Sequence, residues 1–153
     1  MKKLLYLILF FISLQIIQPE WIQKKVEDDQ KISTSPEVLS ILKRSCFDCH
    51  SYETELPFYS RITPVSFFLK HHIEEGRKEL NFSTWETLSE NKKQNKAEEI
   101  WEEIQSGEMP LFSYTLIHRE AKLSSDDKLV LKKWLSTYLE EEKNGETRTN
   151  SKK

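Results

Sequence analysis

Residues 35–50 read SPEVLSILKRSCFDCH, and this stretch marks where the folded part of the chain begins. Ser35 is a favourable helix N-cap, Pro36 fits the first helical position, and Glu37 places a negative charge in the first turn. Apolar residues then recur at helical spacing as far as Cys46. The pattern predicts a helix that ends at the sequence Cys-Phe-Asp-Cys-His.

That sequence, residues 46–50, has the spacing Cys-x-x-Cys-His, the signature of covalent haem attachment. Residues three apart share one face of a helix, so the thiols of Cys46 and Cys49 can reach two vinyl groups of one porphyrin. His50 is then carried beneath the iron as the proximal ligand, bound through its outer ring nitrogen. We expect a backbone carbonyl to hold its other N–H group. The prediction is one covalent haem c, with its iron, per chain.

Three other uses of the two cysteines stay open. Cys46 and Cys49 could form a small disulfide, although such a short loop stabilises little and leaves His50 without a role. They could bind structural zinc together with His50, His71 or His72, but the second paired half-site is missing. A thiol–disulfide redox motif normally follows a strand in a βαβ unit, and no strand is predicted here.

Met109 is the candidate for the second axial position of the iron. It is the only methionine besides Met1 and lies in the turn sequence Gly-Glu-Met-Pro. Thioether ligation is typical of electron-transfer cytochromes and raises the reduction potential; the alternative is a methionine that fills a gap in the core. His72, on the apolar face of its predicted helix, is the second choice. His118 is expected to be a local hydrogen-bonding group.

The N-terminus has the layout of an export signal, because Lys2 and Lys3 precede an apolar run that reaches residue 17. No small-residue cleavage site follows, and the segment up to residue 22 approaches the length of a membrane span with Trp21 at the interface. We favour an uncleaved anchor in the cytoplasmic membrane, with the domain on the periplasmic side of a bacterial envelope. Cleavage and release to the periplasm is the alternative.

The remaining chain divides by composition. We predict a polar tether over residues 23–34, the domain over residues 35–139 and a disordered polar tail over residues 140–153. Within the domain, a second helix should open at Thr63-Pro64 and close at Gly76, with an inward face formed by Val65, Phe68, Leu69, His72 and Ile73. A third should start near residues 83–85, a fourth should end at Gly107, and the last should start at Ser124. No strand pair is evident, so the predicted fold class is all-α.

Composition narrows the function. Hydrophobic residues make up 37% of the chain, so the domain is poor in core material and a bound apolar disc would help to fill it. The net charge is −2, with 23 basic and 25 acidic residues interspersed. This distribution gives no basic surface for nucleic acid, and we exclude nucleic-acid binding.

The chain resembles the bacterial haem-binding domain family, small envelope proteins with one Cys-x-x-Cys-His site. The resemblance covers about Ser35 to Tyr138 and rests on these residues: Cys46–His50, Pro64-Val65-Ser66, His71-His72-Ile73, Gly76-Arg77, Leu80-Asn81-Phe82-Ser83, Trp85, Met109-Pro110, Leu116, His118, Leu123-Ser124 and Trp134. It implies a cytochrome c-like helical domain around one haem, often behind an N-terminal apolar helix, with Met109 matching the Met-Pro turn of the family. It implies little about the physiological role.

Two functions are consistent with these residues. The favoured one is a one-electron carrier rather than an enzyme. The sequence does not identify the redox partner of this carrier. The alternative is a haem-based gas or redox sensor, or a peroxidase-like enzyme, with an open or displaceable sixth ligand. In that case His71 or His72 would serve as a distal acid–base group.

Overall fold

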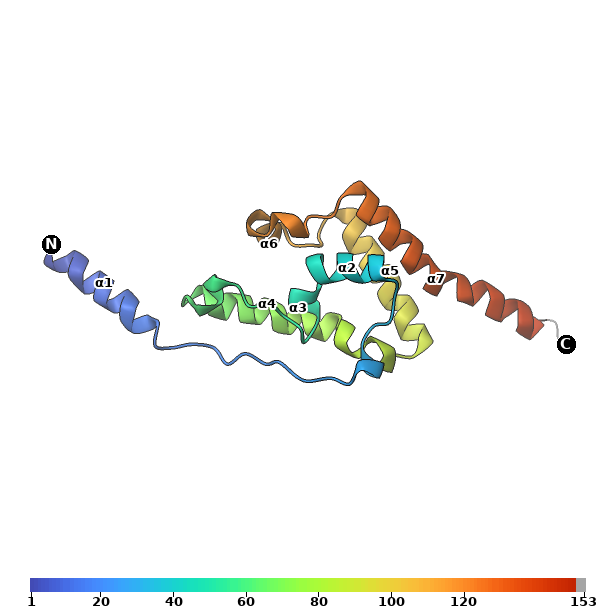
Figure 1. Ribbon diagram of the computed structural model, residues 1–153, viewed down its shortest axis with the longest axis horizontal. Coiled ribbons are helices and arrows are strands. Elements are labelled where there is room, and N and C mark those ends of the chain that lie inside the picture. The colour runs from blue at the N-terminus through green and yellow to red at the C-terminus, as the bar shows by residue number, and fades with distance from the viewer. Residues whose placement is uncertain (151–153) are drawn as a thin grey trace.

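Helices are the only regular elements in residues 1–150, so the predicted all-α class is confirmed (Figure 1). The computed structural model describes the backbone of these residues and the side chains of residues 1–139. The elements are α1 (Lys2–Leu14), η1 (Asp28–Gln30), α2 (Pro36–Ser45), α3 (Phe47–His50), η2 (Phe58–Arg61), α4 (Val65–Glu79), η3 (Phe82–Thr87), α5 (Glu90–Ser106), α6 (Phe112–Ile117), η4 (Arg119–Ala121) and α7 (Ser125–Asn150), where η denotes a short 3-10 helix.

The core lies where α5 packs along the first half of α7 and α2 packs against α7. Trp85 of η3 is fully buried there. Its ring packs at 6.2 Å from that of Trp134 and at 5.5 Å from that of Tyr138, and its indole N–H donates to the Tyr138 hydroxyl at 3.2 Å. Large aromatic side chains bury much apolar area per residue, which compensates for the lean composition.

Three predicted helix boundaries are confirmed. The Ser35 hydroxyl accepts a hydrogen bond from the Val38 N–H and caps α2. Gly107 ends α5 with φ of 85°, a left-handed conformation that suits glycine. Ser124 and Asp127 cap α7 reciprocally, because each side chain accepts from the other residue's backbone N–H, at 3.1 and 2.8 Å.

Helix α4 differs from its prediction in two respects. It does not close at Gly76 but runs on to Glu79. The glycine does not end the helix; it permits a close approach to α3, since a Cβ there would lie 2.9 Å from the Cys49 carbonyl oxygen. Its predicted inward face is only partly correct, since Ile73 is buried while Phe68 is 61% exposed. The third predicted helix, near residues 83–85, is the 3-10 segment η3.

Residues 23–34 are not the free tether that we expected. Ile32 is buried in the core, and its N–H donates to the Phe82 carbonyl at 2.9 Å. Upstream, the Gln23 side chain donates to the Thr54 carbonyl at 3.0 Å. One buried apolar residue and isolated hydrogen bonds and ion pairs, such as that of Lys31 with Glu53, hold this segment, and none of them produces a periodic pattern in the sequence.

The two ends of the chain extend away from the core (Figure 1). Helix α1 has no buried residue. Among the helices of residues 1–150, none combines the length and the apolar character that crossing a bilayer requires. At the other end, the backbone of α7 is helical as far as Asn150, although we expected no fixed structure from residue 140 onward. The propagation of a helix whose first half is packed accounts for this difference. Residues 151–153 of the predicted tail lie outside the described residues.

Candidate functional site

His50 is held by the C-terminal end of α4. Its Nδ1 atom lies 2.9 Å from the Gly76 carbonyl oxygen and 3.1 Å from that of Leu80. Carbonyl oxygens only accept, so Nδ1 carries the proton and Nε2 keeps its lone pair. Burial lowers the pKa of His50, against the opposing effect of the two carbonyls. The result is a neutral imidazole in a fixed orientation, and the expected carbonyl partner is present.

Two thiols flank this imidazole. Cys46 lies between α2 and α3, Cys49 lies in α3, and both are free. Burial raises the pKa of Cys46 to about 12 and that of Cys49 to about 11. Redox-active Cys-x-x-Cys motifs have a lowered thiol pKa. Neither these values nor the strand-free fold of residues 1–150 supports the thiol–disulfide oxidoreductase alternative.

The zinc alternative lacks a set of ligands. Among the side chains described, residues 1–139, no three of the His, Cys, Asp and Glu type converge as a metal site would require. His71 is exposed on α4. A structural zinc needs four ligands in tetrahedral geometry, which the two cysteines do not find here.

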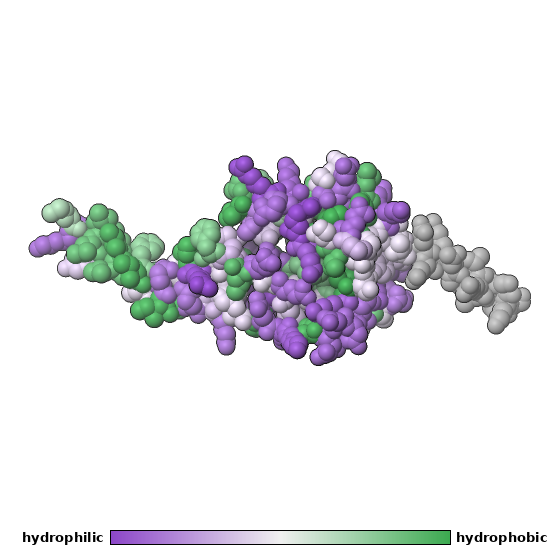
Figure 2. Space-filling model, viewed as in Figure 1, coloured by the Kyte–Doolittle hydropathy of each residue, from purple (hydrophilic) through white to green (hydrophobic). Residues whose placement is uncertain are grey.

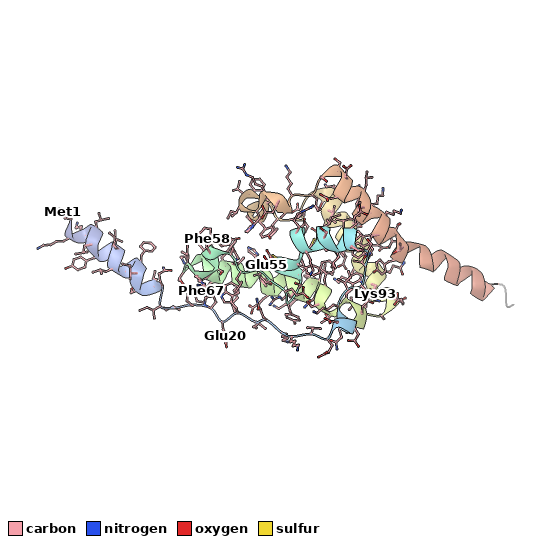
Figure 3. The ribbon with its side chains drawn as sticks, viewed as in Figure 1. Met1, Glu20, Glu55, Phe58, Phe67 and Lys93 are labelled. Carbon is pink, nitrogen blue, oxygen red and sulfur yellow. The ribbon has the colours of Figure 1, made fainter. Side chains whose placement is uncertain are left out.

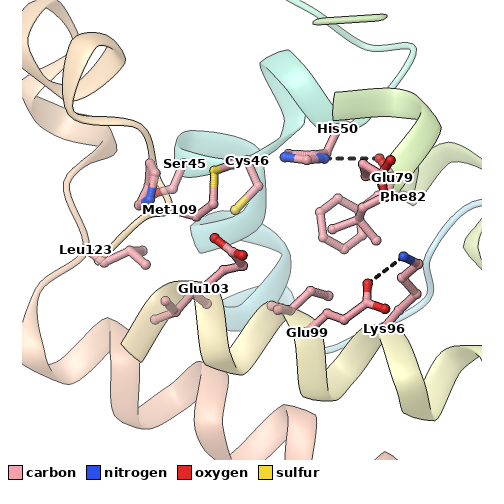
Figure 4. Close-up of a pocket in the computed structure, with 14 residues that line it drawn as sticks. Ser45, Cys46, His50, Glu79, Phe82, Lys96, Glu99, Glu103, Met109 and Leu123 are labelled. Atoms are coloured by element: carbon pink, nitrogen blue, oxygen red, sulfur yellow. Dashed lines mark hydrogen bonds and ion pairs between the residues drawn. The ribbon is translucent and has the colours of Figure 1, made fainter. Parts of the chain in front are cut away.

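An apolar cleft opens beside His50. One cavity of about 310 Å³ has Cys46, His50 and Met109 on its wall (Figure 4). Its other lining residues are Ser45, Glu79, Leu80, Phe82, Lys96, Glu99, Ile100, Glu103, Ile104, Pro110 and Leu123. A second cavity of about 250 Å³ shares six of these residues and adds Asp48, Cys49, His72, Glu75, Gly76, Leu111 and Tyr114. We call the two cavities together the His50 cleft.

The two candidates for the distal ligand differ in position. Met109 lines both cavities, and its backbone N–H donates to the Glu103 carbonyl at 3.1 Å, which fixes the turn directly after α5. His72 lines only the second cavity, with its ring packed edge-on against Phe68 at 4.2 Å. The structure therefore brings Met109 into the cleft that His50 lines, and its role as a ligand stays a prediction.

Sequence reasoning missed Tyr114 and Asp48, which close the second cavity. The Tyr114 hydroxyl donates to the Asp48 carboxylate at 2.6 Å and so joins α6 to α3. Burial, together with this carboxylate, raises the pKa of Tyr114, which remains a neutral phenol. His118 stacks on Tyr114 at 4.5 Å and hydrogen-bonds the Tyr59 hydroxyl at 2.7 Å, a local role as expected. No motif marks the tyrosine, because the fold alone brings it to α3.

Ser45 provides a test of what the cleft can hold. This residue lines both cavities, and its hydroxyl is, among the described side chains, the buried polar atom without a hydrogen-bond partner. A buried polar group without a partner is costly and points to a missing one. An apolar cleft of this size with one oriented imidazole fits a group that is mainly apolar, has a metal for the imidazole and carries polar substituents. Haem has these three properties.

The fold and the cleft together define a helical haem-binding protein. The sequence matches the family described as haem-binding domain over residues 7–137. The chain belongs to this haem-binding domain family, as the resemblance indicated. The match begins upstream of Ser35 and includes Gln23 and Ile32, whose contacts with the domain are described above. Comparisons with curated proteins and with solved structures give no match.

Proposed function

We propose that the protein carries one haem c on Cys46 and Cys49, with His50 Nε2 as the proximal iron ligand, and transfers single electrons at a bacterial cell envelope. The observation that carries the proposal is the orientation of His50 by Gly76 and Leu80 on the wall of an apolar cleft that Cys46 also lines. When bound, haem supplies one-electron chemistry by cycling between the ferric and ferrous states.

The residues of this chain would set the properties of that group. The two carbonyls at the end of α4 make the His50 imidazole more electron-rich, which favours ferric iron. A thioether from Met109 would act in the opposite direction and raise the reduction potential. Apolar side chains of the wall, which include Phe82 and Ile104, would keep water from the face of the group that they cover and lower the local dielectric constant there.

Location at the envelope is supported by the sequence of the N-terminus. Lys2 and Lys3 precede the exposed apolar helix α1, and covalent haem attachment needs machinery that acts on exported chains. We propose that α1 enters the cytoplasmic membrane as an anchor, with the domain on the periplasmic side.

Covalent attachment is tested by mass and by haem staining. The full chain is purified from a host with haem-attachment machinery and compared with a Cys46→Ala, Cys49→Ala double variant. We expect the wild-type mass to include one haem and its band to stain after denaturation, and the variant to lose both signals. Colourless wild-type protein, or staining that survives in the double variant, would refute the proposal.

The sixth ligand is tested by spectroscopy of two matched variants. We expect Met109→Ala to abolish a thioether-to-iron charge-transfer band, to lower the reduction potential and to let the ferrous form bind carbon monoxide. His72→Ala should leave all three properties unchanged. An unchanged spectrum for Met109→Ala would exclude this residue as a ligand.

A second function, a haem-based sensor or a peroxidase-like enzyme, is favoured by one observation. His72 lines the second cavity together with Met109, the residue proposed for the sixth position, and would there supply an acid–base group for a bound small ligand. Rapid binding of carbon monoxide by the wild-type ferrous protein, slowed or weakened in His72→Ala, would support this function over the electron carrier.

A further inference from the structure

Large apolar side chains are exposed at the end of the domain where α4 begins. Phe58 of η2 is 78% exposed and Phe68 of α4 is 61% exposed, and Ile62, Val65 and Phe67 between them are exposed as well. Figure 3 labels Phe58 and Phe67 at the end of the domain that is nearest α1. We call these five residues the Phe58 patch. Contiguous exposed apolar surface of this kind marks a site of interaction.

Helix α6 extends the same surface. Phe112, Leu116 and Ile117 are all exposed, and Figure 1 shows α6 at the same end of the domain as the start of α4. The hydrogen bond of 2.7 Å between the Tyr59 hydroxyl and His118 Nε2 holds the end of α6 to η2. The apolar residues of two separate elements are therefore fixed in one region.

The chain that leaves α1 is bonded to the base of the Phe58 patch. Thr63, which lies between patch residues, donates from its hydroxyl to the Ile17 carbonyl at 2.6 Å. The Gln15 side chain accepts from the Thr63 N–H at 2.9 Å and donates to its carbonyl at 3.1 Å. Gln18 donates to the Arg61 carbonyl at 3.2 Å. These bonds fix the patch beside the residues that follow α1.

Helix α1 identifies the partner of the patch. It is apolar from residue 4 to residue 12 and has no buried residue, and a helix that is apolar all round is stable only in a protein core or in lipid. Figure 2 shows hydrophobic surface on α1 and at places on the adjoining end of the domain, with hydrophilic surface over much of the remaining visible face. The exposed side chain of Arg61 can reach phosphate groups from the edge of the patch.

We propose that the Phe58 patch rests in the surface of the phospholipid bilayer that α1 enters, so that the haem domain docks on the membrane in one orientation. This inference rests on the envelope location in the proposed function. Helix α4 separates the patch residues that it carries from the carbonyls of Gly76 and Leu80, about 12–22 Å away at a rise of about 1.5 Å per residue. The first cavity, which Cys46, His50 and Met109 line, has no patch residue on its wall, so it is kept clear of the lipid and open to a soluble redox partner.

Photo-crosslinking of the full, haem-loaded chain tests the contact. A benzophenone amino acid replaces Phe58 or Phe68 in the patch, Phe11 in α1, or Leu129, which is 66% exposed on α7, a helix that packs on α5 and α2. All four side chains are exposed, so the probe does not disturb the core; at Phe68 it replaces a ring that packs on His72 at 4.2 Å, and Phe58 supplies a patch position without that contact. The protein is reconstituted in vesicles of phosphatidylethanolamine and phosphatidylglycerol, irradiated and examined by peptide mass spectrometry.

We expect lipid adducts at Phe11, Phe58 and Phe68 with a yield about tenfold above that at Leu129, because only an inserted side chain contacts acyl chains. Adducts at Phe11 but not at the patch would overturn the docking and leave the anchor intact. A lack of adducts at all sites would overturn both the docking and the membrane location. Protein adducts at Phe58 would show that a second copy or another protein covers the patch, and would also overturn the inference.

Discussion

The close approach of α3 and α4 at Gly76 should affect both the free energy of unfolding and the reduction potential of the bound haem. A Cβ at this position would lie 2.9 Å from the backbone oxygen of Cys49 and 3.4 Å from its Cβ. The obstacle is backbone rather than a flexible side chain, so Gly76→Ala forces the two helices apart. The Gly76 carbonyl, which accepts from His50 Nδ1 at 2.9 Å, moves with its helix.

Two opposing effects set the magnitude for Gly76→Ala. Replacing glycine by alanine inside a helix stabilises by about 0.5–1 kcal/mol. Overpacking against fixed atoms costs about 1–3 kcal/mol. We therefore expect a net loss of about 0.5–2 kcal/mol in the free energy of unfolding. A weaker hydrogen bond from His50 should also make its imidazole a poorer donor and raise the reduction potential.

The assay is guanidinium unfolding of the ferric protein, followed by circular dichroism and haem absorbance, together with a redox titration. Lys78→Ala is the matched control, since Lys78 is exposed two residues further along α4 and its ion pair with Glu75 is a surface pair. Such pairs contribute at most about 1 kcal/mol, and the haem signals of this variant should not change. Greater stability of Gly76→Ala, with an unaltered spectrum and potential, would refute the reasoning.

Three further predictions concern the core, a helix cap and the thiols. Trp85→Ala should cost about 3–5 kcal/mol by denaturant unfolding, because the ring is fully buried, whereas Leu129→Ala should be nearly neutral. Desolvation raises the pKa of Asp127. Hydrogen bonds from the backbone and side chain of Ser124 and from the Arg44 side chain lower this pKa by more, so that it lies below its usual value of 3.8. Asp127→Asn should therefore cost about 1 kcal/mol at pH 7, and the difference from wild type should vanish in unfolding titrations as the pH falls through that lowered value. In folded, haem-free protein, alkylation of the two cysteines at pH 8 should be much slower than in urea, because burial raises both thiol pKa values; equal rates would contradict this.

Local signals carried the correct predictions. Ser35 and Pro36 started α2, Gly107 ended α5, and Ser124 with Asp127 started α7, because capping depends on a few adjacent residues. The haem motif was recognisable for the same reason.

The errors arose where distant segments meet. Gly76 looks like a helix terminator in sequence, yet it serves a contact with α3, 26 residues earlier. Ile32 sits in a polar stretch and enters the core only because Phe82 lies beside it. Tyr114 acquires its role from Asp48, which is 66 residues away. Tertiary contacts of this kind leave no periodic trace in the chain.

Helix α4 connects the two halves of the function that we propose. Its first residues are joined to the chain leaving α1 through Thr63, and its last turns supply the carbonyls that orient His50. In the function that we propose, this one helix would fix both the distance of the haem from the membrane and the direction of the imidazole that binds it. The exposed phenylalanines at one end of α4 and the tightly packed glycine at the other are consistent with this arrangement. Each is unfavourable in an isolated surface helix. The close approach of α3 explains the glycine, and the lipid contact that we propose would explain the phenylalanines.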